Sequence, residues 1–135
     1  AGRNRIMVNQ QNFLNYLKRF NTNFLYFEDH NLSDKIKNLC SLCPKIVIME
    51  IGSGLVNLLF IKKIYLKNIK FIIIDQSEWK FNNSRIFNIF NLLDLNYDIF
   101  TCNTIYKNNE SDKKNNPFEI NINEFESKYN KLLSN

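Results

Sequence analysis

The sequence is poor in the two residues that most often interrupt secondary structure, with three Gly and two Pro among 135 residues. It also lacks a long apolar run, because the longest candidate, residues 55–61, contains Asn57 and is followed by Lys62 and Lys63. A membrane-spanning helix needs about 20 mostly apolar residues, so no transmembrane segment and no membrane partner are expected. Three Cys without regular spacing predict no disulfide framework. They indicate an intracellular protein, with cytoplasmic, nuclear and organellar compartments left open.

Apolar and aromatic residues are abundant instead. Hydrophobic residues make up 44% of the chain and aromatic residues 14%, which is enough for a packed core and excludes a wholly disordered chain. The length predicts a single domain over residues 1–135. The formal net charge of +5 permits an anionic partner such as RNA without requiring one.

Hydrophobic periodicity predicts alternating helices and strands. Helices are expected over residues 9–20, 32–42, 55–66, 83–95 and 123–133, and strands over 45–51, 70–74, 97–102 and 117–122. The polar residues 107–116 are expected to form a flexible loop. The first two strands are apolar on both faces and are joined through a helix, which indicates a parallel βαβ unit. The predicted fold class is therefore α/β with a mostly parallel sheet.

Two of the three Gly residues, Gly52 and Gly54, fall in one short turn, EIGSG, between the first predicted strand and the next helix. A Gly turn at the carboxyl end of a parallel strand lets the backbone approach a ligand, and the following helix start favours an anionic group. Asp75 ends the second strand, where a carboxylate can accept hydrogen bonds from ribose hydroxyls. The dinucleotide pattern needs a third Gly where this chain has Asn57. The turn therefore favours S-adenosylmethionine, with a tight turn that binds nothing as the alternative.

Two segments resemble the opening motifs of the ribosomal RNA adenine dimethyltransferases. These are residues 18–25 (KRFNTNFL) and 48–55 (IMEIGSGL), where the family has K-x-F-G-Q-N-F-L and V-x-E-I-G-P-G-L. The family includes the erythromycin-resistance methylases and the mitochondrial transcription factor B proteins, and the resemblance covers residues 18–122. It implies a Rossmann-like methyltransferase fold, shortened at its C-terminal side, with S-adenosylmethionine as cofactor and structured ribosomal RNA as partner. A further chain or a missing C-terminal segment would then complete the RNA-binding part.

The resemblance also implies roles for single residues. The cofactor would be contacted by Asn23, Leu25, Gly52, Gly54, Asp75 and Asn103. Within this set the two Gly residues would hold the methionine part and Asp75 the ribose. Asn103 stands where the family has an Asp that contacts the adenine amino group.

The catalytic motif of the family, N-L-P-Y/F, is matched by Asn115-Asn116-Pro117-Phe118. The resemblance implies that Asn115 and a neighbouring carbonyl hold the N-6 amino group of a target adenine. The ring of Phe118 would stack on the flipped base, which has lost its neighbours in the helix. The implied reaction is methyl transfer from S-adenosylmethionine to adenine N-6.

Two other functions remain open. Asn103 replaces the acid of the family and little sequence follows Phe118, which favours a catalytically inactive relative. Such a relative would bind RNA or protein in an organellar ribosome or transcription complex. The second alternative is a thioredoxin-like domain built on residues 71–102, although no cysteine pair begins its helix.

One C-x-x-C pair, Cys40 and Cys43, stands apart from these motifs. It closes a predicted helix and precedes a strand, whereas a redox pair should follow a strand and open a helix. A zinc site would need two more ligands, and only Cys102 and His30 remain. We therefore expect structural or buried cysteines and no metal.

Overall fold

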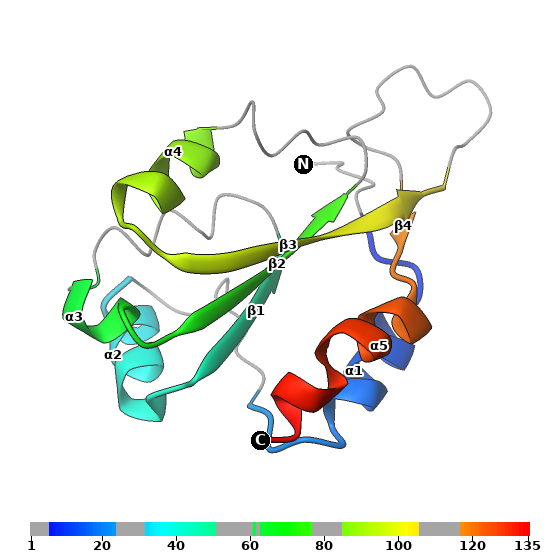
Figure 1. Ribbon diagram of the computed structural model, residues 1–135, viewed down its shortest axis with the longest axis horizontal. Helices are drawn as coiled ribbons and strands as arrows, with labels where there is room; N and C mark the ends of the chain where they lie inside the picture. Colours follow the sequence, from blue (N-terminus) through cyan, green and yellow to red (C-terminus); the bar gives the residue numbers. More distant parts are fainter. Residues whose placement is uncertain (1–5, 24–31, 51–60, 62, 77–84, 106–116) are drawn as a thin grey trace. The chain divides into compact units, whose positions relative to one another are not determined.

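The computed structural model describes residues 6–23, 32–50, 61, 63–76, 85–105 and 117–135. Its elements, in chain order, are α1 (Gln10–Leu17), α2 (Leu32–Leu42), β1 (Ile46–Glu50), α3 (Lys63–Leu66), β2 (Lys70–Gln76), α4 (Arg85–Leu92), β3 (Asn96–Thr104), β4 (Phe118–Glu119) and α5 (Ile122–Leu133) (Figure 1). The predicted α/β class with a mostly parallel sheet is confirmed. None of the helices within these ranges is long and apolar enough to cross a bilayer.

The four strands form one sheet in the order β1-β2-β3-β4. β1 and β2 are parallel, with a register that runs from Ile46 opposite Lys70 to Glu50 opposite Ile74. β4 is antiparallel to β3 and pairs Phe118 with Thr104. A Rossmann-like sheet places its first strand inside the sheet, whereas β1 comes at one end of the order among the described strands.

The chain divides into two compact units, of which one contains residues 24–74 and 80–99. Its centre is β2, where the four residues Phe71 to Ile74 are at most 1% exposed. A strand buried on both faces needs a continuous apolar run, which these residues provide. The ring of Phe90 in α4 lies edge-on to Phe71, with centroids 6.1 Å apart. α4 thus packs its aromatic residue on the central strand.

α4 ends in a Schellman turn that lacks the usual glycine. The Leu95 N–H donates to the Phe90 carbonyl (3.2 Å), and the Asp94 N–H donates to the Asn91 carbonyl (3.2 Å). Asp94 has a φ of 52°, in the left-handed region. A residue with a Cβ atom is strained there, and Gly is the usual occupant of this position.

Asp94→Gly should therefore stabilise the protein by about 0.5–1 kcal/mol, because it relieves the strain and leaves both backbone hydrogen bonds in place. Urea denaturation measures this change as a higher midpoint at an unchanged slope. Asp94→Ala is the matched control, since it removes the same carboxylate and keeps the Cβ atom. If Asp94→Ala stabilised the protein as much as Asp94→Gly, charge and not backbone strain would be the cause.

The other unit contains residues 1–23, 75–79 and 100–135. Its core is a cluster of aromatic side chains centred on Phe125 of α5, which is 0% exposed. The ring centroid of Phe125 lies 4.9 Å from Phe13 of α1, 5.2 Å from Phe100 of β3 and 4.8 Å from Tyr129. Phe125 and Tyr129 are four residues apart, so they face the same side of α5. This cluster joins both helices to the second half of β3.

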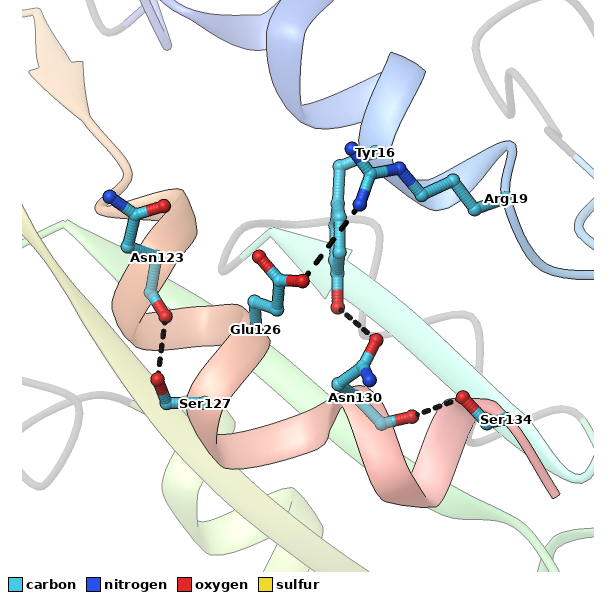
Figure 2. A network of polar contacts seen from close by, with 7 residues as sticks. All are labelled: Tyr16, Arg19, Asn123, Glu126, Ser127, Asn130 and Ser134. Carbon is cyan, nitrogen blue, oxygen red and sulfur yellow. Dashed lines mark hydrogen bonds and ion pairs between the residues drawn. The ribbon is translucent and has the colours of Figure 1, made fainter.

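Two polar contacts also link α1 and the residues that follow it to α5, and Figure 2 shows them. The Tyr16 hydroxyl donates to Asn130 Oδ1 (3.4 Å), and Arg19 Nη1 lies 3.8 Å from Glu126 Oε1. The ion pair is exposed and contributes little stability. The aromatic contacts are therefore the main attachment of α5 to α1.

Backbone and amide contacts hold the start of α1 beside the segment between β4 and α5. The Asn9 side chain donates to the Ile120 carbonyl (2.8 Å) and accepts from the Ile120 N–H (3.1 Å). Asn121 caps α5, because its Oδ1 accepts from the Glu124 N–H (3.0 Å). The two helices of this unit thus begin next to each other.

Candidate functional site

The carboxyl ends of β1 and β2 define the edge where the sequence predicts a ligand. Because the strands are parallel and Glu50 lies opposite Ile74, Asp75 is the next residue along β2 at this edge. Ligands of open α/β sheets bind outside the carboxyl ends of the strands. The exposed side chain of Glu50 ends β1, whereas the Asp75 residue is only 7% exposed.

Asp75 is a buried acid without full hydrogen bonding. Its Oδ1 atom is buried and has no hydrogen-bond partner among the residues that the structure describes. Burial removes water from the carboxylate and raises the pKa of Asp75 from 3.8 to about 7. Asp75 directly follows four apolar residues of β2 that are at most 1% exposed.

This arrangement is typical of a binding group. Buried polar atoms in folded proteins nearly always have a hydrogen-bond partner, so a buried carboxylate oxygen without one indicates a place where a ligand can donate a hydrogen bond. A strongly perturbed pKa at a strand end is also a mark of functional sites. In its ionised form Asp75 can accept hydrogen bonds only, and hydroxyl groups of a ligand would satisfy it.

Asn103 is another residue predicted to contact the cofactor, and its side chain is described. It belongs to the same unit as Asp75 but does not lie at the end of β2. It is exposed on β3 and lies opposite Glu119 of β4. Both residues line an open polar hollow of about 430 Å³, together with the first residues of α1 and α5. Asp75 is not among the residues that line this hollow. No local sequence signal could have paired Asn103 with Glu119, because only the antiparallel return of β4 brings them together.

The interpretation of Phe118 as a stacking residue needs correction. Pro117 is buried and Phe118 is 0% exposed. The Phe118 N–H donates to the Ile6 carbonyl (2.9 Å), and the Phe118 carbonyl accepts from the Val8 N–H (2.9 Å). Paired on both sides and packed in the core, Phe118 offers no ring face to a base. Asn115, the first residue of the predicted catalytic motif, lies outside the described residues.

The remaining predicted cofactor residues are largely outside the described ranges. Asn23 is exposed at the end of the first described segment. Leu25, Gly52 and Gly54 are not described, so their predicted roles stay predictions.

The burial expected as one alternative for Cys40 and Cys43 is not found at Cys43, whose thiol makes a local hydrogen bond instead. Cys102 is 2% exposed and Cys40 is half-buried, whereas Cys43 is exposed. Cys43 follows the last residue of α2 with a φ of 45°, and its thiol donates to the Cys40 carbonyl (3.1 Å). Among the residues that the structure describes, no three His, Cys, Asp or Glu side chains form a group able to hold a metal ion.

Comparison of the chain with protein-family models, with curated proteins and with solved structures gave no match. The candidate site is therefore argued from Asp75 and its surroundings.

Proposed function

We propose that this chain binds S-adenosylmethionine at the carboxyl edge of β1 and β2 and acts as a Rossmann-like RNA methyltransferase. The observation that carries the proposal is the buried Oδ1 atom of Asp75, which lacks a hydrogen-bond partner in the part of the chain that the structure describes. It lies at the strand end where the sequence pattern predicts a ribose-binding acid. Ribose hydroxyl groups would supply the donors that this carboxylate lacks.

The other proposed contacts follow from the sequence pattern. Gly52 and Gly54 would leave room for the methionine part, with Asn23 and Leu25 beside it. The Asn103 carbonyl oxygen could accept from the adenine amino group, although a neutral acceptor makes a weaker bond than a carboxylate. The bound cofactor would supply an electrophilic methyl group. The proposed acceptor is an adenine N-6 amino group of structured RNA, held by Asn115.

The burial of Phe118 favours a second candidate function. Because the Phe118 ring is buried, it is not available to stack on a flipped base as predicted. Together with Asn103 in place of an acid, this supports a relative that binds the cofactor or RNA without transferring a methyl group.

Calorimetric titration of the full chain with S-adenosylmethionine tests the cofactor proposal. We expect micromolar binding that Asp75→Ala weakens about 10- to 100-fold, because charge-assisted hydrogen bonds to the ribose are lost. Binding should strengthen between pH 6 and pH 8, since only the ionised carboxylate accepts both hydroxyl protons. Asp94→Asn is the matched control, because Asp94 is exposed and Asn tolerates its backbone conformation.

Absence of binding by the unaltered chain would overturn the cofactor proposal. Where binding is found, transfer of a labelled methyl group to ribosomal RNA distinguishes the two candidates. Labelled N-6-methyladenine supports the methyltransferase, and binding without transfer supports the inactive relative.

A further inference from the structure

A second hollow lies in the unit that contains residues 24–74 and 80–99, beside the turn that leads into β2. It has a volume of about 250 Å³ and is lined by the end of α2, the segment between α2 and β1, and α3 with its flanking residues. Its floor is apolar, and the residues that form it are only 1–6% exposed: Leu39, Ile61, Leu66 and Ile69. Ile64 and Tyr65 also line it and are 74% and 55% exposed. Large exposed apolar side chains beside a concave apolar surface are typical of a binding site.

The charges at this hollow have one sign. Among the described residues that line it, Lys45 is the only charged one, and its side chain is exposed. Lys67, also exposed, follows the lining residue Leu66. In the described part of the chain neither lysine forms an ion pair. A ligand that matches this hollow therefore has an apolar body and one negative charge.

We propose that this hollow binds a medium-chain aliphatic carboxylate, with the chain on the apolar floor and the carboxylate at Lys45. The volume is near the lower limit of small-molecule pockets, which favours a ligand with a short apolar chain. One lysine at the rim matches one carboxylate. The site shares no residue with the Asp75 site and does not depend on the proposed function.

Two thiols make occupancy of the hollow measurable. Cys40 and Cys43 both line it, and Cys43 is exposed enough to react with an alkylating reagent. A chain lying on the floor would cover these thiols. Cys102 is buried and serves as the internal reference.

The first test titrates the full chain with butyrate, hexanoate and octanoate and measures binding by calorimetry. Each added methylene that enters the hollow should strengthen binding about fourfold. Saturating octanoate should also slow the alkylation of Cys43 by iodoacetamide, followed by peptide mapping. Equal affinity for hexanoate and octanoate, or an unchanged alkylation rate, would overturn the proposal.

The second test measures how much the ligand's carboxylate and its apolar chain each contribute to binding. Lys45→Gln should weaken octanoate binding by up to about fivefold, the usual range for an exposed ion pair, and leave octan-1-ol binding unchanged. Lys37→Gln is the matched control, because Lys37 is an exposed lysine of α2 outside the hollow. Ile64→Asp changes an exposed residue, so it should fold normally and weaken octanoate more than octan-1-ol. If Lys45→Gln and Lys37→Gln had the same effect, the carboxylate would not lie at Lys45.

Discussion

The free energy of unfolding of the unaltered protein should fall strongly as the pH rises from 4 to 7, and Asp75→Asn should abolish this fall. In the unfolded chain Asp75 loses its proton near pH 3.8, whereas in the folded protein burial holds the pKa at about 7. Between these values the folded state binds more protons, so the free energy of unfolding falls as the pH rises. Above about pH 7 the contribution stays constant at its lowest value. The whole change is of the order of 4 kcal/mol, since each pKa unit corresponds to about 1.4 kcal/mol.

Urea denaturation of the unaltered protein and of Asp75→Asn at intervals from pH 4 to pH 8 measures this effect. Other acids titrate in both proteins, so the difference between the two curves isolates Asp75. The difference should move in favour of the Asn variant as the pH rises. A difference that is the same at every pH would mean that Asp75 is ionised and well solvated in the folded protein.

This pH dependence bears on the proposed cofactor site. An acid that destabilises the folded protein at neutral pH is a cost that a ligand can offset, because any ligand that binds only the folded state stabilises it. S-adenosylmethionine should therefore raise the stability of the unaltered protein more at pH 8 than at pH 6. It should raise the stability of Asp75→Asn less at both values.

Phe125→Ala should destabilise the protein by about 3–5 kcal/mol. Phe125 is 0% exposed and its ring contacts residues of α1, β3 and α5. Removing the ring leaves a cavity where three elements meet and also removes several edge-on aromatic contacts. Because a domain of this kind is stable by only about 5–15 kcal/mol in total, the variant should lose a large share of its free energy of unfolding.

Thermal and urea denaturation of Phe125→Ala, Phe125→Leu and Leu92→Ala test this role. Phe125→Leu keeps most of the apolar volume and should lose less than Phe125→Ala. Leu92 is 78% exposed on α4, so Leu92→Ala should change stability by no more than about 0.5 kcal/mol. If Phe125→Ala were as mild as Leu92→Ala, the aromatic cluster would not hold α5 in place.

Much of the secondary structure could be predicted from local pattern. The predicted helix over residues 32–42 coincides with α2, and the predicted strands lie over β1, β2 and β3. The apolar spacing of 3.6 or 2 residues is a property of a short segment, so it needs no knowledge of distant partners. The position of Asp75 at the end of β2 was predictable for the same reason.

The outcome for Phe118 depended on contacts between distant segments. Its residue type suits a stacking role and a core position equally well. Pairing with Ile6 and Val8, more than 100 residues away in sequence, places it in the core. The same return of β4 brings Glu119 opposite Asn103.

Local pattern thus determined α2, the parallel strands β1 and β2, and the acid near the end of β2. The helix predicted over residues 55–66 is described only as the four residues of α3, and Ile61 lies outside it. Only the tertiary structure decided that Asp75 is buried, with one oxygen unpaired among the described residues. It also decided that Cys43 is exposed and that an apolar hollow forms between α2 and α3. The reason is that periodicity arises from neighbours along the chain, whereas burial and hydrogen bonding depend on which distant segments meet.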